Sequence, residues 1–137
     1  MKKLLLVLIS TVFLFGCSSD GGDSGSSSSY NPPTWIQGTW GIKADGSIYQ
    51  NDQPFFKFTS DNFCLIAGGI SQCWKEVIQQ TPQIMSGSDS HTDSTYEVNL
   101  IQSNGAVTVT YNFKKVSATK IILVDALSGN IELEKLN

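Results

Sequence analysis

A nineteen-residue stretch, TYEVNLIQSNGAVTVTYNF (residues 95–113), constrains the fold of this 137-residue chain more than any other feature. Asn104-Gly105 favours a two-residue type I′ turn, because both central residues of that turn need a positive φ. A turn centred there places almost only apolar residues on one face of the hairpin and polar residues on the other. A shift of one residue would destroy this segregation, so turn and pattern select the same register. The predicted pairs are Gln102–Val107, Leu100–Val109, Val98–Tyr111 and Tyr96–Phe113.

A second hairpin is predicted in FCLIAGGISQCW, residues 63–74, by the same reasoning. A turn at Gly68-Gly69 pairs Cys64 with Cys73 at a non-hydrogen-bonded position. The Cα atoms of such a pair lie about 4.5 Å apart, within the range that a disulfide spans. The more apolar residues alternate onto the other face, so the disulfide is expected on the outer wall. Metal binding or redox chemistry is the alternative for this C-x8-C pair, but no histidine lies nearby.

Much of the remaining chain also carries short alternating segments that are typical of strands. A turn at Ser128-Gly129 would place Asp125 opposite Glu132, and the repulsion between them indicates either a different register or a cation between the acids. With no convincing helix, the fold class expected is an all-β, antiparallel up-and-down barrel of about eight strands. The further strands are expected at Trp35–Ile42, Pro54–Thr59, Lys120–Ala126 and Ile131–Leu136, and another is expected to begin at Ile48-Tyr49.

The N-terminus has the layout of a secretory signal peptide. Two lysines precede an apolar run of about twelve residues, Leu4 to Phe15, which is shorter than the roughly 20 residues of a transmembrane helix. Leu14-Phe15-Gly16-Cys17 resembles the lipobox of bacterial lipoproteins. The resemblance implies cleavage before Cys17 and acyl chains, such as palmitate, attached to it as a membrane anchor. Ser18 stands where an aspartate would retain such proteins in the inner membrane, so the outer membrane is expected.

The composition predicts three regions: a cleaved signal peptide (1–16), a lipidated cysteine with a flexible tether (17–33) and one domain (34–137). The tether is Gly/Ser-rich and nearly free of apolar residues, so it cannot form a core. After cleavage, 7 lysines remain against 12 acidic residues, a net charge of about −5, and the chain contains no arginine. This balance argues against a nucleic-acid partner. A monomer is expected.

Residues Gln79 to Ser94 are expected to form the one long loop, and they contain the sole histidine, His91. Ser88, His91 and Asp93 could be written as a catalytic set, but neighbours on a mobile loop lack the orientation that nucleophilic catalysis needs. Asp89, His91 and Asp93 are too few ligands for a metal site. The expectation is a solvated loop at the barrel mouth that is available for recognition, with no enzyme activity, no metal and no cofactor.

The first strand, IQGTWGI (residues 36–42), carries Gly38-x-Trp40 and resembles the opening strand of lipocalins and of small lipocalin-like domains of bacterial lipoproteins. The resemblance implies a barrel in which Gly38 allows close backbone approach and Trp40 closes the narrow end. The family's arginine over this tryptophan has no counterpart here. Trp35 remains open between a ligand contact and a structural role. The residues expected to line or fill the lumen are Phe56, Phe58, Phe63, Trp74, Tyr96, Tyr111 and Phe113.

Three functions follow as expectations. The first is an outer-membrane-anchored lipoprotein whose barrel binds a small apolar ligand. The second is a periplasmic or surface inhibitor or interaction protein of the protease- or lysozyme-inhibitor type, presenting residues 18–33 or 79–94 to an envelope protein. The third is a structural envelope lipoprotein without a ligand.

Overall fold

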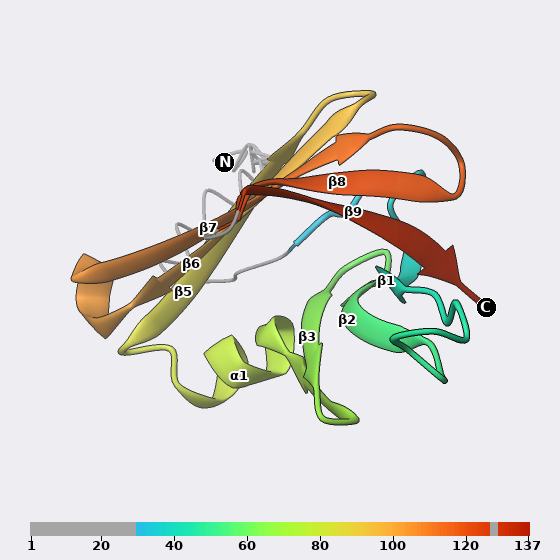
Figure 1. Ribbon diagram of the computed structural model, residues 1–137. Helices are drawn as coiled ribbons and strands as arrows, with labels where there is room; N and C mark the ends of the chain where they lie inside the picture. Colours follow the sequence, from blue (N-terminus) through green and yellow to red (C-terminus); the bar gives the residue numbers. More distant parts are fainter. Residues whose placement is uncertain (1–29, 127–128) are drawn as a thin grey trace, which may run out of the picture.

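A computed structural model describes residues 30–126 and 129–137; the expected lipidation site Cys17 lies outside the described residues. The described chain forms one antiparallel sheet of nine strands that curls strongly into a half-barrel (Figure 1). The strands are β1 (Gly38–Ile42), β2 (Gln53–Phe58), β3 (Phe63–Ala67), β4 (Ile70–Cys73), β5 (Met85–His91), β6 (Thr95–Gln102), β7 (Val107–Lys115), β8 (Lys120–Ala126) and β9 (Gly129–Leu136).

The strand order is β4-β3-β2-β1-β9-β8-β7-β6-β5, so the first and last strands pair and the sheet stays open between β4 and β5. The all-β, up-and-down prediction is confirmed, but the expected closed barrel is wrong. After four residues of β4 the chain becomes a short helix, α1 (Trp74–Gln80), which was not expected. Trp74 and Ile78, one helical turn apart, are both buried, and the helix therefore fills part of the gap with side chains instead of strand hydrogen bonds.

Both hairpins have the predicted registers. β6 and β7 pair Leu100 with Val109 and Tyr96 with Phe113. At their turn, Asn104 has φ 55° and ψ 37° and Gly105 has φ 93°, which are the values of a type I′ turn. The β3–β4 hairpin turns at Gly68 and Gly69 and pairs Cys64 with Cys73. A two-residue glycine-containing turn therefore set the register in both cases.

The β8–β9 hairpin differs from the expected register. Glu132 lies opposite Ile122, and Asp125 is not its partner. The register shifts between Leu123 and Ala126, where Asp125 adopts a positive φ of 56°. An irregularity of this kind inserts extra residues into one strand, and the alternation of charged and apolar residues does not reveal it.

Three segments differ from the strands and loops expected for them. Residues 79–94 are not a loop, because they contain the end of α1 and all of β5, and β5 pairs with β6 along seven residues. The first strand begins at Gly38, after a turn in which Ile36 N–H donates to Pro33 O. Ile48-Tyr49 does not begin a strand but lies in the β1–β2 loop. In the part of the chain that the structure describes, no helix has the length and apolarity needed to cross a membrane.

Tyr30 belongs to the core although it lies within the expected tether. Its side chain is 2% exposed, and its ring packs edge-on against Phe63 at 6.4 Å between centroids. On the other side its hydroxyl lies against Gly87 of β5. Tyr30 therefore spans the opening between the β1–β4 and β5–β9 parts of the sheet, and the packed chain begins at least four residues before Thr34.

Candidate functional site

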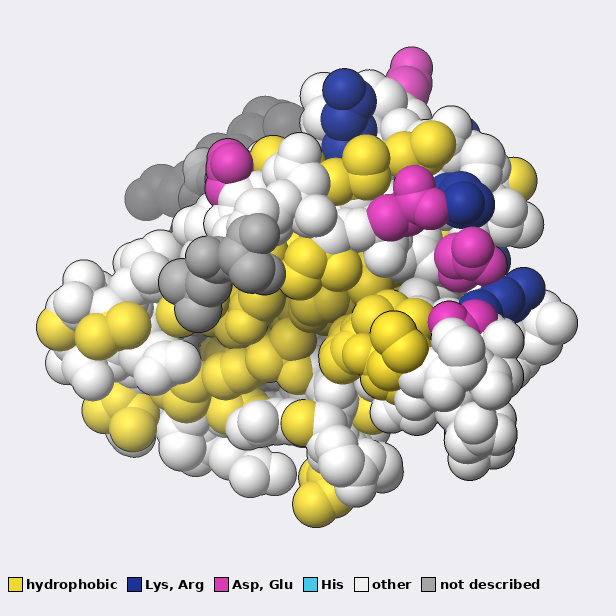
Figure 2. All heavy atoms as spheres, in the orientation of Figure 1, with side chains coloured by type: hydrophobic (Ala, Val, Ile, Leu, Met, Phe, Trp, Pro, Cys, Tyr) yellow, Lys and Arg dark blue, Asp and Glu magenta, His cyan; other side chains and the backbone are white. Residues whose placement is uncertain are grey.

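One end of the half-barrel, which we call the mouth, is framed by turns that the strand pairing brings to the same side. Met85 at the start of β5 lies beside Gln102, and Gln102 lies beside Val107, so the β6–β7 turn and the start of β5 share this end. The β1–β2 loop (43–52), the β3–β4 turn and the Ala126–Gly129 pair, where β8 ends and β9 begins, also lie here, because consecutive strands alternate in direction. The view in Figure 2 shows hydrophobic side chains gathered in the hollowed centre of one face.

An apolar cavity of about 170 Å³ lies at the mouth. It is formed by β1, β2, β8 and β9, and none of its lining side chains is polar. Leu123 and Ile131 face each other across the β8–β9 pair at its floor. We call this cavity the apolar trough; its lining residues are Ile42, Phe55, Phe56, Leu123, Ile131 and Leu133.

A second hollow of about 400 Å³ shares Leu123 with the apolar trough. Val109, Tyr111 and Ala126 supply its apolar walls, and Thr110 and Asp125 supply its polar ones. Burial raises the pKa of Tyr111, so its hydroxyl stays protonated and can donate a hydrogen bond. The apolar trough and this second hollow thus meet at Leu123, and only the second hollow carries polar groups.

Phe55 reaches the apolar trough because of a β-bulge. Trp40 pairs with Phe56, whereas the next residue, Gly41, pairs with Pro54, so Phe55 has no partner on β1. Gly41 lies so close to the backbone of Gln53 that a Cβ would overlap it. The bulge thus turns an otherwise outward-facing side chain toward the mouth, as bulges near binding sites often do. Alternation alone would place Phe55 on the outer wall.

Aromatic rings fill the lumen away from the mouth. Six of the seven aromatic residues expected to line or fill it are buried, and Tyr111 is half-buried beside the second hollow. Rings from opposite parts of the sheet interlock: Phe56 and Phe58 lie edge-on to Phe113 at centroid distances of 5.1 and 5.2 Å. The buried six are Phe56, Phe58, Phe63, Trp74, Tyr96 and Phe113.

Trp40, the middle residue of β1, is fully buried, with its Nε1 donating to Ile36 O at 2.6 Å. Lys135 Nζ lies 5.5 Å from the centre of the Trp40 ring. A cation thus lies over this ring, although the chain has no arginine to match the one that packs over the tryptophan in the lipocalin family. Gly38 has a φ of 127°, and a Cβ there would come within 2.6 Å of Lys135 Cε. Trp35 is half-buried, with Nε1 donating to Thr92 O at 3.4 Å, and takes no part in either hollow.

The Cys64–Cys73 disulfide is present, with Cα atoms 4.0 Å apart. The side chain of Cys64 is buried, with 1% of its surface exposed, and that of Cys73 is half-buried. The bond joins β3 to β4, the short edge strand that precedes α1. It therefore holds the edge of the sheet next to the opening.

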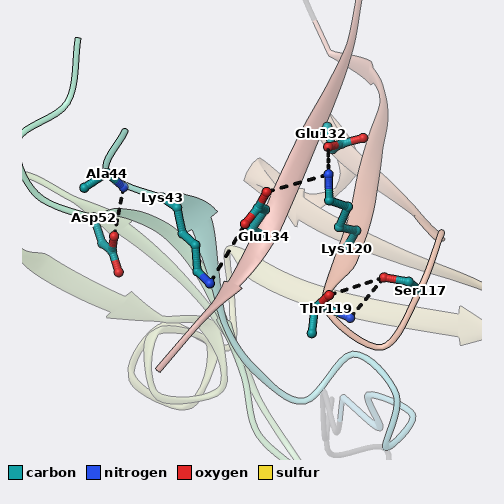
Figure 3. Close-up of polar contacts among 8 residues, drawn as sticks. All are labelled: Lys43, Ala44, Asp52, Ser117, Thr119, Lys120, Glu132 and Glu134. Carbon is teal, nitrogen blue, oxygen red and sulfur yellow. Dashed lines mark hydrogen bonds and ion pairs between the residues drawn. The ribbon is translucent and has the colours of Figure 1, made fainter. Parts of the chain in front are cut away.

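Lysine and glutamate side chains cross the outer surface of β1, β9 and β8 (Figure 3). Lys120 Nζ lies 2.6 Å from Glu132 Oε1 and 3.6 Å from Glu134 Oε1, and Lys43 Nζ lies 4.0 Å from Glu134. Lys120 thus bridges Glu132 and Glu134, and its hydrogen bond to Glu132 raises the pKa of Lys120. All these groups are well exposed, so the ion pairs add little to stability.

A third hollow, of about 600 Å³, lies beside the β5–β6 turn and has both polar and apolar walls. His91, Lys114 and Asp125 are among its lining residues. Asp89, expected near His91, instead accepts hydrogen bonds from Tyr96 Oη at 2.8 Å and from the Asn31 amide at 2.6 Å. Among residues 30–126 and 129–137, no three His, Cys, Asp or Glu side chains gather closely enough to hold a metal ion.

Comparison with protein-family models, with curated proteins and with solved structures finds no match for this chain.

Proposed function

We propose that the protein is an outer-membrane-anchored lipoprotein whose half-barrel binds a small apolar ligand at the mouth. The observation that carries the proposal is the apolar trough, because it is a cavity lined by six apolar side chains in a lumen that is otherwise packed with rings. Its volume of about 170 Å³ is below the roughly 300 Å³ of ordinary ligand pockets. A single hydrocarbon chain or one small ring therefore suits it better than a bulky ligand.

The second hollow restricts the chemistry of the ligand further. Thr110 and the Tyr111 hydroxyl offer hydrogen bonds next to the trough, whereas Asp125 places a negative charge there. A carboxylate or phosphate on the ligand would be repelled by that charge. The ligand class we propose is an amphiphile with an apolar tail and a neutral or cationic polar group.

The anchor proposal rests on residues 1–17. The two lysines, the short apolar run and Leu14-Phe15-Gly16-Cys17 support cleavage and acylation at Cys17. Gly38-x-Trp40, with Lys135 over the Trp40 ring, supports the likeness to lipocalin-like lipoprotein domains. Replacing Cys17 with Ser tests the anchor, because the variant should no longer partition into membranes.

The inhibitor alternative has less support. Residues 79–94 were one of the two segments that could be presented to an enzyme, and they contain the end of α1 and a paired strand, β5. The edge of β5 is also partly occupied, since the Asn31 amide donates to Asp89 and Tyr30 packs at Gly87. A pull-down from periplasmic extract that recovers a stoichiometric enzyme would favour this alternative.

Blocking the apolar trough tests the binding proposal. Ile131→Trp enlarges a half-buried side chain at the trough, so the indole should occupy most of the cavity and abolish binding of the neutral apolar fluorophore N-phenyl-1-naphthylamine. The measurement is fluorescence titration of the secreted, unacylated chain from Ser18 to Asn137. Native mass spectrometry of the same preparation should detect a retained amphiphile in the wild type only.

Val116→Trp is the matched control, because Val116 is 52% exposed and lies beyond the other end of β7. It adds an indole without touching the trough and should bind the fluorophore as the wild type does. Wild-type protein that binds neither fluorophore nor amphiphile would contradict the proposal. Equal binding by the Ile131→Trp variant would show that the trough is not the site.

A further inference from the structure

Exposed apolar side chains gather around the mouth. Six large hydrophobic side chains are exposed among the described residues, and five of them border the mouth. Ile48 and Ile70 protrude furthest, with 79% and 74% of their surface exposed. We call these five the rim: Ile48, Phe55, Ile70, Ile84 and Val107. The sixth, Val116, lies in the β7–β8 turn at the opposite end.

The segments that carry most of the rim have no charged residues. Residues 62–74, 77–88 and 98–113 contain no Asp, Glu, Lys or His. In Figure 2 the charged side chains accordingly lie in the upper and right parts of the view, whereas uncharged polar and hydrophobic side chains form the left and lower parts. Asp61, Lys75 and Lys115 lie at the opposite end, whereas at the mouth the β1–β2 loop is the charged exception, with Lys43, Asp45 and Asp52 around Ile48. The part of the mouth that is both apolar and uncharged loses little by leaving water for the interface of a bilayer.

The chain between the proposed anchor and the domain is short enough to keep the mouth near the bilayer. Twelve residues, Ser18 to Ser29, separate Cys17 from Tyr30. A Gly/Ser-rich chain of this length has a root-mean-square span of about 20 Å. This span is comparable to the length of a six-residue strand, so an acyl anchor at Cys17 would keep the mouth within reach of the bilayer.

We propose that the mouth is the membrane-facing side of this domain, with the rim inserted at the boundary between headgroups and acyl chains. The inference rests on the proposed function and deepens it. With the rim in the bilayer, the apolar trough opens onto lipid, and the tail of an amphiphile passes from one to the other without crossing water. The partner is therefore a lipid surface with little net charge, and the ligand comes from that surface.

Two valines at opposite ends of β7 provide a matched test. Val107 belongs to the rim and is 49% exposed, and Val116 is 52% exposed at the other end. Each is replaced with Cys in the full, acylated chain, labelled with a polarity-sensitive fluorophore and placed in phosphatidylcholine vesicles with brominated acyl chains. The label at residue 107 should lose about half of its fluorescence, because an interfacial side chain reaches the acyl boundary. The label at residue 116 should keep its fluorescence.

A second pair of variants tests the rim itself. Ile48→Ser with Ile70→Ser should abolish the quenching at residue 107, while the acyl chains keep the protein on the vesicles. Both side chains are exposed, so these changes should leave the unfolding midpoint in urea unchanged. The control is Lys57→Ser with Lys114→Ser, which changes two charged positions outside the rim. It should leave the quenching at residue 107 unchanged.

Sedimentation of the same samples distinguishes the proposal of a membrane-facing mouth from the proposal of a lipid anchor. Protein that sediments with vesicles but shows no quenching at residue 107, or equal quenching at 107 and 116, overturns the membrane-facing mouth and leaves the anchor standing. Protein that stays in the supernatant overturns both. A dimer in solution that already shields the label at residue 107 also overturns the docking proposal, since a second copy would then cover the rim.

Discussion

Gly87 shows at the residue scale how one missing side chain lets the N-terminal segment enter the core. Tyr30 Oη lies where a Cβ of residue 87 would be, so no other residue type fits without moving the tyrosine. The hydroxyl is buried and has no hydrogen-bond partner among the residues described. Burial of such a group without a partner costs stability, and the packing of the Tyr30 ring against Phe63 compensates for it.

Gly87→Ala should lower the free energy of unfolding by about 1–3 kcal/mol, because the added methyl group overpacks the site. Tyr30→Phe alone should be neutral or stabilising, since it removes the unpaired hydroxyl. The double variant should recover part of the loss, and urea unfolding of the four proteins measures the coupling. Ser88→Ala, at the exposed neighbour on β5, is the control and should change little. Additive effects in the double variant would contradict the contact.

At the element scale, two buried tyrosines lie close to the Asp89 carboxylate of β5, on the β5 side of the opening between the β1–β4 and β5–β9 parts of the sheet. Tyr96 Oη donates to Asp89, and Tyr30 lies nearby. Burial raises the pKa of Tyr96 far above its ordinary value near 10, and the charge of Asp89 and the donated hydrogen bond raise it further. Burial, assisted by Asp89, likewise raises the pKa of Tyr30. Both hydroxyls therefore resist ionisation in the folded protein.

Stability should consequently fall at alkaline pH. The unfolded chain loses tyrosine protons near pH 10, while the folded chain keeps them. The contribution of these two tyrosines to the free energy of unfolding is therefore complete below about pH 10 and is lost as the pH rises above it. Urea midpoints measured from pH 8 to 11 should decline less steeply in the Tyr30→Phe/Tyr96→Phe variant than in the wild type. Lysine titration affects both proteins alike. Tyr49→Phe, in the β1–β2 loop, should retain the wild-type slope. Equal slopes in the double variant and the wild type would show that Tyr30 and Tyr96 do not cause the alkaline loss of stability.

The elements that could be predicted from the sequence are those whose register a local turn determines. Asn104-Gly105 and Gly68-Gly69 did this, and the disulfide followed from the second. β5 was not recognised, because its sequence, MSGSDSH, has no alternation of apolar and polar residues and its pairing depends on its neighbour β6. For α1, the spacing of Trp74, Val77 and Ile78 was a helical signal that strand expectations on both sides obscured.

On the scale of the whole molecule, the two parts of the sheet meet through one strand pair. β1 and β9 pair at Thr39–Leu136, Trp40–Lys135 and Gly41–Glu134, and rings of both parts share one core. Neither part has a core of its own. Almost the full length of the described chain separates these partners, so their pairing comes at a high loop-closure cost.

Removal of Lys135–Asn137 should therefore destabilise both parts together. The loss of the buried Leu136 side chain alone should cost about 2–5 kcal/mol. Hydrogen exchange should show protection falling to the same extent in β2–β3 and in β6–β7, and removal of Asn137 alone should change neither. Persistent protection of β6–β7 after the longer truncation would show instead that β5–β9 folds independently.

The aromatic filling of the lumen could be predicted from alternation in the strands, whereas the apolar trough could not. Leu123 and Ile131 meet across β8 and β9 only in a register that the irregularity at Asp125 sets. Phe55 reaches the trough only through the bulge on β2. Tertiary pairing decides both positions, and no short-range pattern encodes it.

The opening between β4 and β5 has a mechanical consequence. In a closed barrel, strand number and stagger set the circumference, and widening it breaks backbone hydrogen bonds. Here the last part of the circumference consists of Tyr30, Trp74 and Ile78 side chains. These contacts are non-directional, so a shift of α1 would change the width of the half-barrel without breaking a hydrogen bond between strands.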